Sequence, residues 1–312
     1  MDSDAKFMGK SMKNGVPTLS VVTPSYNRGA LLKKCFESLH KQTNFNFEWI
    51  VVDDGSVDDT KTVMESMTNS NIQFPIRYIW KENGGKHTAL NAAHPFIQGK
   101  YVLILDSDDM LTPDAVEVIL SAWEQYASDQ EIGIITFVKK TTDGRICAYA
   151  KDENVPTDVL RYQRVCVTSS DCCEVIRSEL FKKYPFPVFE GERFLAETAL
   201  WYRAGLDGSC VYINKPVYIC EYLEGGLTKS GKKLRINNPK GGMYTSYLRM
   251  HSRCSFKERM KAGLLYICYG YFASKKVRTM IREAKPYRFL AILCLIPGQV
   301  LHLLWRKKYF EG

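Results

Sequence analysis

The sequence predicts an α/β fold with a mostly parallel, Rossmann-like sheet flanked by helices and followed by a basic helical extension. Short apolar runs alternate with helical patterns in the first third of the chain, and such runs are typical of strands covered on both faces. The charge changes sign near the end, where residues 225–312 hold 19 Lys and Arg against 3 Asp and Glu. We therefore expect a loose leader at 1–16, an α/β domain at 17–225 and a basic, aromatic-rich helical region at 226–312.

The expected strands are short apolar runs bounded by polar residues: Leu19–Thr23, Phe47–Val52, Ile76–Trp80, Tyr101–Leu105, Ile132–Phe137 and, after an Asp143-Gly144 turn, Ile146–Ala150. Helices are expected where apolar residues recur every three or four positions or where a cap precedes them. The predicted helices are Ala30–Gln42, one opened by a Ser56–Asp59 capping box and reaching Met67, His87–Ile97, and one that begins at Thr112-Pro113.

Polar clusters follow the first four predicted strands: Pro24–Arg28, Asp53–Ser56, Glu82–Lys86 and Asp106–Asp109. Parallel strands end at a common edge, and ligands of such sheets bind beyond the carboxyl ends of the strands. We therefore expect these clusters to meet and form a ligand site.

The cluster Asp106-Ser107-Asp108-Asp109 is the candidate metal site. Asp106 and Asp108 could share one Mg²⁺ or Mn²⁺, with water and a diphosphate completing the shell. Such a cation would offset the charge of a leaving nucleoside diphosphate. The alternative is an acidic run favoured by a helix N-terminus.

Two further clusters are candidates for nucleotide contacts. Asp53 or Asp54 could accept a hydrogen bond from a base or a ribose, with Gly55 allowing a tight turn, or could belong to a cap and turn only. Asn83–Lys86 could direct amides and an ammonium group at phosphate, or form a plain strand-to-helix turn. Walker A and dinucleotide glycine motifs are absent, which argues against P-loop NTPases and ordinary dehydrogenases.

Together these segments resemble the family 2 glycosyltransferases, which have the GT-A fold. The resemblance rests on the segments Thr23–Arg28, Val51–Ser56, Asn83–Gly85 with Ala89–Asn91, and Leu105–Asp109, in that order. It is specific over about residues 18–115 and slight beyond 225. It implies a nucleotide pocket formed by Pro24, Tyr26, Asp53 and Asp54, with Asp106 and Asp108 at the metal and the diphosphate. Arg28, Lys86 and Ser107 are further candidates for nucleotide binding.

The resemblance also implies inversion at the anomeric carbon by direct displacement, which needs a general base. Many relatives use the Asp of a Glu-Asp pair, followed by Trp four residues later and Arg six residues later. Glu197, Trp201 and Arg203 fit that spacing, so Glu197 is the candidate base. The sequence departs from the pattern, because Ala196 replaces the first acid and Glu the second. Glu192, Trp201 and Arg203 are the weaker acceptor or diphosphate candidates, and Glu190 and Glu192 compete with Glu197 for the role of base.

The basic C-terminal region contains an interrupted apolar run, Phe289–Trp305. Its 17 residues would span ~26 Å as a helix, short of a ~30 Å hydrocarbon core, so we expect contact with an anionic membrane surface and no spanning helix. The alternative is a buried helical hairpin. The loop expected from Gly225 offers Lys229, Lys232, Lys233 and Arg235 to the diphosphate of a lipid-linked acceptor, or is simply flexible.

The ten cysteines show no metal-binding spacing and no secreted disulfide pattern, which favours a cytoplasmic protein that is peripheral to the inner face of the cell membrane. The predicted function is metal-dependent transfer of a sugar, of hexosyl type, from a nucleotide-diphosphate donor to a glycan or lipid-linked glycan in surface polysaccharide synthesis. Two alternatives are a sugar-phosphate nucleotidylyltransferase, although Thr23–Gly29 lacks its Gly-rich, Arg-containing loop, and a non-catalytic nucleic-acid-binding protein, which no motif supports. We expect no nucleic-acid partner.

Overall fold

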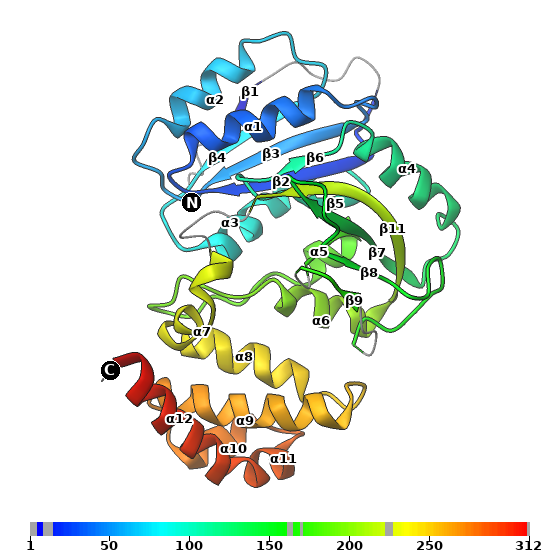
Figure 1. Cartoon of the computed structure of the whole chain (residues 1–312). Helices are drawn as coiled ribbons and strands as arrows, with labels where there is room; N and C mark the ends of the chain where they lie inside the picture. Colours follow the sequence, from blue (N-terminus) through cyan, green and yellow to red (C-terminus); the bar gives the residue numbers. More distant parts are fainter. Residues whose placement is uncertain (1–4, 9–14, 161–164, 169–170, 222–226, 311–312) are drawn as a thin grey trace. The chain divides into compact units, whose positions relative to one another are not determined.

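The structure, a computed structural model, describes residues 5–8, 15–160, 165–168, 171–221 and 227–310 (Figure 1). The chain divides into two compact units. Unit 1 comprises Met1–Pro185 and Ala204–Tyr222, and unit 2 comprises Phe186–Arg203 and Leu223–Gly312. Residues 186–203, which the sequence placed with the first domain, thus group with the C-terminal helices.

Unit 1 is built on a nine-stranded sheet in the order β1-β4-β3-β2-β5-β10-β7-β11-β6. Four neighbouring strands are parallel, as the alternating pattern predicts. They are β4 (Ile76–Trp80), β3 (Phe47–Asp53), β2 (Leu19–Ser25) and β5 (Tyr101–Ile104). Strands β2 and β3 are buried along their whole length, and most of their residues are apolar. Two of the polar ones pair inside the sheet, where Ser20 Oγ donates to Glu48 (2.6 Å).

The rest of the sheet is mixed. Strand β10 (Cys172–Arg177) is antiparallel to both β5 and β7 (Ile132–Thr141), whereas β11 (Ser209–Cys220) is parallel to β7. The edges are β6 (Met110–Leu111) and β1 (Ala5–Met8), so part of the predicted loose leader is an edge strand paired with β4. The turn at Gly144 has φ +87° and leads towards β8 (Ala148–Tyr149), which pairs with β9 (Val165–Cys166).

Helices cover both faces of the sheet (Figure 1). One face packs against α1 (Gly29–His40), α2 (Thr60–Thr68) and α4 (Ala115–Gln125), whose buried residues share a core with β3 and β5. The helix α3 (Lys86–Ala93) contacts β2 and β3 from the other face, and α5 (Ser178–Lys183) contacts β10. Helix α6 (Thr198–Asp207) begins in unit 2 and ends in unit 1.

The predicted helix boundaries differ from the observed ones by one to four residues, and two of the differences have a clear cause. Helix α2 begins at Thr60 without the Ser56–Asp59 capping box, because the Ser56 hydroxyl accepts a hydrogen bond from Asn27 N instead. Helix α4 begins at Ala115, two residues beyond Pro113. Helix α3 ends at Ala93, and Pro95 lies in a 3₁₀ turn over His94–Phe96, since proline cannot supply the next helical hydrogen bond.

Unit 2 is helical. It contains α7 (Leu227–Asn237), α8 (Pro239–Arg249), α9 (Phe256–Phe272), α10 (Val277–Glu283), α11 (Arg288–Leu293) and α12 (Leu295–Phe310). Helix α9 is central and packs against α8, α11 and α12. The loop predicted from Gly225 is therefore wrong over 227–237, where α7 runs with a break at Gly231. Over the described part of the chain, every helix is too short or too polar to cross a membrane.

Candidate functional site

The four strand-end clusters of unit 1 meet at one edge of the sheet, as predicted. Asn27 N donates to the Ser56 hydroxyl (2.8 Å), which joins the first cluster to the second, and Asn83 Nδ2 donates to Asp54 O (2.9 Å), which joins the second to the third. Lys86 Nζ pairs with Asp106, and Arg28 pairs with Asp108. The contacts form a closed ring, so all four clusters belong to one site.

The two candidate metal ligands, Asp106 and Asp108, are both partly exposed. Their side chains are 33% and 18% exposed, whereas Ser107 between them is buried. Their partners stand at helix starts: Lys86 is the first residue of α3 and Arg28 immediately precedes α1. Because these helices follow β4 and β2, the fold directs both cations towards the carboxylates at the end of β5.

A third cation, Lys139 in β7, adds to the positive charge around this acid cluster. Burial would raise the pKa of Asp106, but Lys86, Lys139 and Arg28 outweigh it and lower that pKa. Burial alone would lower the pKa of Lys139, yet Asp106 and Asp109 raise it above its usual value. The raised pKa of Lys139 favours its charged form next to the candidate metal ligands.

Asp109 is the buried member of the cluster and is tied to β11. Its carboxylate accepts hydrogen bonds from Tyr218 OH (2.8 Å) and Glu221 N (3.0 Å), and Asp106 N donates to the same Tyr218 oxygen (3.0 Å). Burial and the neighbouring Asp106 raise the pKa of Asp109 to about 7. Tyr218 therefore fixes the backbone of the cluster, and Asp109 supports it from behind.

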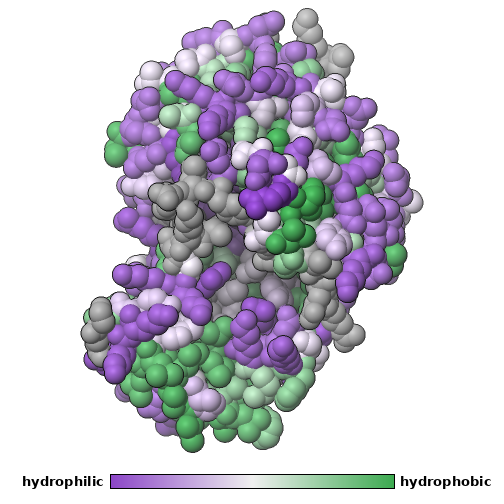
Figure 2. Space-filling model, in the orientation of Figure 1, coloured by the Kyte–Doolittle hydropathy of each residue, from purple (hydrophilic) through white to green (hydrophobic). Residues whose placement is uncertain are grey.

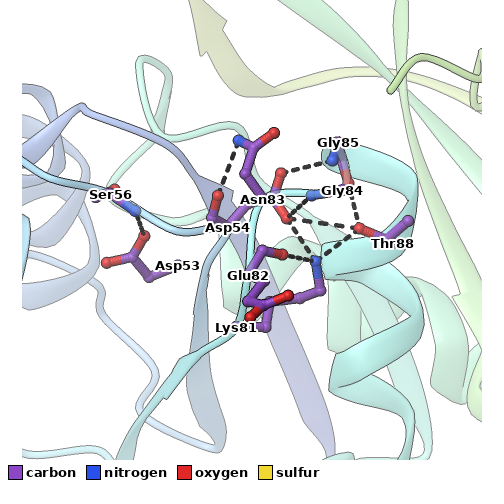
Figure 3. Close-up of polar contacts among 9 residues, drawn as sticks. All are labelled: Asp53, Asp54, Ser56, Lys81, Glu82, Asn83, Gly84, Gly85 and Thr88. Atoms are coloured by element: carbon purple, nitrogen blue, oxygen red, sulfur yellow. Dashed lines mark hydrogen bonds and ion pairs between the residues drawn. The ribbon is translucent and has the colours of Figure 1, made fainter. Parts of the chain in front are cut away.

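The carboxylate of Asp54 is held by the turn before α3 (Figure 3). Gly84 N and Gly85 N donate to it at 3.0 and 2.7 Å, and Lys81 Nζ lies 2.7 Å from Oδ1. The glycine amides that we considered for phosphate binding are therefore directed at an internal carboxylate. Gly85 adopts φ +95°, which only glycine takes without strain, and this turn aims both amides at Asp54.

Asp53 is also buried and internally bonded. It accepts hydrogen bonds from Ser56 N (2.8 Å) and Tyr78 OH (2.5 Å). The predicted tight turn at Gly55 is present, with φ +84°, and a Cβ there would lie 2.7 Å from Asn83 N. Asp53 and Asp54 thus shape this edge, and any nucleotide contact they make uses a lone pair left over from these bonds.

The first cluster offers one exposed aromatic residue. Tyr26 is 46% exposed, whereas Pro24 is buried within β2. The Ser25 hydroxyl, 3% exposed, finds no hydrogen-bond partner among the residues that the structure describes. An unpaired buried hydroxyl next to Tyr26 is a ligand candidate that the sequence analysis missed, since nothing in the motif separates Ser25 from its neighbours.

The candidates from 190–203 lie in unit 2. Glu192 is 8% exposed, and its carboxylate accepts hydrogen bonds from Lys240 N (2.7 Å) and Gly241 N (2.8 Å) at the start of α8. It therefore stabilises a helix N-terminus. Glu197 is partly exposed and directly precedes α6, while Trp201 is 9% exposed within that helix. The Arg203 Nε donates to Ala199 O (2.8 Å).

The basic candidates of unit 2 are on α7. Lys232, Lys233 and Arg235 are exposed, and Lys232 Nζ lies 5.6 Å from the centre of the Trp305 ring. The side chain of Lys229 lies outside the described residues. These cations lie on helix α7, which fixes their backbone positions, whereas we predicted a loop there.

The acid cluster fits a cation that needs few protein ligands. Among the described residues, no three His, Cys, Asp or Glu side chains gather as a metal site. Asp106 and Asp108 are a two-carboxylate donor set, which is what Mg²⁺ or Mn²⁺ takes when a diphosphate and water complete its shell. The side chains of Lys86 and Arg28 neutralise the negative charge of Asp106 and Asp108, which a bound cation would otherwise neutralise.

Comparisons with known proteins agree with this geometry. The family model "Glycosyl transferase family 2" matches residues 20–184. The hyaluronan synthase of Pasteurella multocida is 34% identical over 145 residues, which cover 46% of this chain and 13% of the synthase. The chain therefore aligns with only a small part of that long relative.

Two solved structures have a similar fold. S. aureus TarS 1–349 in complex with UDP-GlcNAc gives a TM-score of 0.60 at 16% identity and covers 95% of this chain and 93% of that chain. The mannosyltransferase PcManGT of Pyrobaculum calidifontis, in complex with GDP-Man and Mn²⁺, gives 0.57 at 16% identity and covers 96% and 91%. The GT-A fold expected from the sequence motifs is confirmed.

Proposed function

The chain belongs to glycosyl transferase family 2, and we propose that it transfers a sugar from a UDP-sugar to a hydroxyl of a glycan or lipid-linked glycan, with inversion, in surface polysaccharide synthesis. The observation that carries this proposal is the ring of contacts that joins the four strand-end clusters around Asp106 and Asp108. The UDP-GlcNAc bound by TarS and the polymer named for the Pasteurella synthase support the donor and product classes.

We propose that Asp106 and Asp108 hold Mn²⁺ or Mg²⁺, as the Mn²⁺ complex of the Pyrobaculum enzyme suggests. The bound cation would act as a Lewis acid and offset the charge of the leaving diphosphate. With such a cation held by Asp106 and Asp108, Lys86 and Arg28 would no longer have to neutralise these carboxylates, and their side chains could bind the phosphate oxygens. Lys139 would remain as a positive charge that, with Lys86 and Arg28, lowers the pKa of Asp106.

For the nucleoside, we propose that the exposed ring of Tyr26 packs on the base. The Ser25 hydroxyl would donate to the nucleotide, which gives it the partner it lacks. Pro24, Asp53 and Ser107 are buried, so they would support the walls of the nucleotide site and make few direct contacts with the nucleotide. Asp54 Oδ2 accepts a hydrogen bond from Gly85 N and keeps a further lone pair that could accept one from an N–H group of the base.

We propose Glu197 as the general base that takes the proton of the acceptor hydroxyl. Its rival Glu192 is occupied by two backbone amides of α8, which removes its oxygens from such a role. Trp201 and Arg203 would support the acceptor side of the site. Lys232 and Arg235 would bind the diphosphate of a lipid-linked acceptor. We propose that the enzyme works at the cytoplasmic face of an anionic membrane.

The test is a transfer assay on the purified chain with a panel of nucleotide sugars, Mn²⁺ and short glycan or lipid-linked acceptors. We expect release of UDP and a new glycosidic bond of inverted configuration, seen by NMR. Formation of a nucleotide sugar from a sugar phosphate and a nucleoside triphosphate would instead identify a nucleotidylyltransferase. Salt-sensitive RNA binding without turnover of any nucleotide sugar would contradict an enzyme altogether.

A further inference from the structure

The helices α11 and α12 are apolar on both of their faces. One face packs on α9 through Leu290, Ala291, Cys294 and Gly298, and a Cβ on Gly298 would lie 2.7 Å from Ile267. The opposite face carries apolar side chains that are between 49% and 77% exposed: Phe289, Ile292, Leu293, Ile296, Val300, Leu303 and Leu304. We name these seven residues the α11–α12 face. Figure 2 shows hydrophobic surface gathered over this part of unit 2.

The spacing of these residues makes a continuous strip. Ile296, Val300 and Leu303 follow one another at four and three positions, so they share one side of α12. Helix α12 has 16 residues and is therefore ~24 Å long. A surface helix normally turns charged or polar residues outward, and an exposed apolar strip that runs from Phe289 to Leu304 is a sign of a binding surface.

Cations border the α11–α12 face. Arg288 starts α11, and Arg306, Lys307 and Lys308 are exposed in the last turns of α12. Residues 284–310 contain no Asp or Glu. Lys232 of α7, over the Trp305 ring, adds a further positive charge beside α12. Apolar side chains with cations at their margin match a leaflet of acyl chains and anionic headgroups.

We propose that the α11–α12 face inserts into the headgroup region of an anionic bilayer, with α12 lying parallel to the surface. Lipid fits better than a second copy of this chain, because a symmetric dimer through this face would pack two stretches that are rich in cations and have no Asp or Glu over residues 284–310. The inference specifies the membrane contact of the proposed function. Its test does not depend on catalysis.

The experiment is flotation of the full chain with vesicles of phosphatidylcholine, alone or mixed with phosphatidylglycerol. We expect the Ile296→Ser/Val300→Ser/Leu303→Ser variant to bind mixed vesicles at least about tenfold more weakly, since it loses insertion of three apolar side chains. The Arg306→Gln/Lys307→Gln/Lys308→Gln variant should bind about a hundredfold more weakly to mixed vesicles and lose the preference for anionic lipid.

Matched variants change the same chemistry elsewhere. Val16→Ser/Val155→Ser/Val188→Ser removes three exposed apolar side chains outside the α11–α12 face, and Lys33→Gln/Lys41→Gln/Lys61→Gln removes three exposed cations of unit 1. Both should float like the unchanged chain. Equal thermal unfolding temperatures confirm that the variants fold.

The proposal is overturned if the serine variant floats like the unchanged chain. It is also overturned if the chain does not float and light scattering shows a dimer that the serine variant abolishes, because the face then binds a second copy. Hydrolysis of the donor in the same samples is read separately. If a variant no longer floats but still hydrolyses the donor, the result bears on the α11–α12 face alone. If the unchanged chain does not hydrolyse any donor, the result contradicts the proposed function and leaves the membrane proposal to the flotation data.

Discussion

Asp54 and Asp108 occupy comparable places, each just beyond an apolar parallel strand and each paired with a cation, Lys81 or Arg28. They differ in what else they bind. The side chain of Asp54 is 5% exposed and also accepts hydrogen bonds from two backbone amides, whereas the side chain of Asp108 is 18% exposed and pairs with the guanidinium of Arg28. A side-chain cation can move away when a ligand arrives, but a backbone amide cannot. The comparison separates carboxylates that hold the fold from carboxylates that can exchange partners.

In unit 2, Glu192 is held by backbone amides as Asp54 is, whereas Glu197 is the proposed base, and we expect the largest effect on turnover from Glu197. Glu197→Gln should lower kcat by ~10²–10⁴-fold, the usual range for a lost general base, with little change in donor affinity. Glu192→Gln keeps one acceptor oxygen but weakens the bonds to the start of α8, so it should lower the stability by about 1–2 kcal/mol and leave kcat near normal. Steady-state kinetics and thermal unfolding of both variants measure this. The reverse pattern would assign the base to Glu192.

Asp108→Asn should reduce transfer by about 10²–10³-fold and remove the metal-dependent part of nucleotide binding. The unfolding temperature should stay nearly unchanged, because the partner Arg28 is itself 28% exposed and can be hydrated. Calorimetric titration with UDP, with and without Mn²⁺, measures the binding. Full activity of the unchanged enzyme in excess EDTA would remove the metal from the mechanism.

Asp54→Asn should act mainly on stability, by about 3 kcal/mol, because it leaves the Lys81 ammonium without its buried counter-charge. Denaturant unfolding gives this value. Asp143→Asn is the control, since it removes a carboxylate whose ion pair with Arg145 is exposed on both sides, and its unfolding curve should not shift. If Asp54→Asn unfolds like the unchanged chain, the Gly84-Gly85 turn does not depend on the carboxylate.

The smallest effect is expected from Tyr218→Phe. The change removes the hydroxyl that accepts from Asp106 N and donates to Asp109, while the ring keeps its packing. We expect a loss of about 1 kcal/mol in stability and a fall in kcat of a few fold, since Asp106 would be held less firmly. A fall in kcat as large as that of Asp108→Asn would mean that the phenol itself contacts the reacting groups.

Much of unit 1 could be predicted from the sequence. Buried parallel strands are continuous apolar runs, so Leu19–Ser25 and Phe47–Asp53 were found to within two residues. Their carboxyl ends share an edge by geometry, so the meeting of the four polar clusters could be predicted without knowledge of any side-chain position. The individual pairs Arg28–Asp108 and Lys86–Asp106 were not predicted.

The rest depended on information that no local pattern carries. Lys139 lies on β7 and Tyr218 on β11, and these strands take their places because β10 lies between β5 and β7. The apolar pattern of the sequence predicts neither this position of β10 nor the register of β11 against β7. Asp54 could not be separated from Asp108, since the direction of the Gly84 and Gly85 amides decides its role. The outward apolar face of α12 needed the position of α9 to tell inside from outside.

The place of β10 in the sheet also limits when the strands can find their partners during synthesis. Strands β2 to β5 can pair as soon as residues 19–104 have been synthesised, but β7 has no neighbour on the β5 side until residues 172–177 follow. The hydrogen bonds to Asp109 come later still, from Tyr218 and Glu221. During synthesis the chain can therefore pair strands β2 to β5 first, whereas the acid cluster can gain its last hydrogen bonds only after residue 221 has emerged from the ribosome.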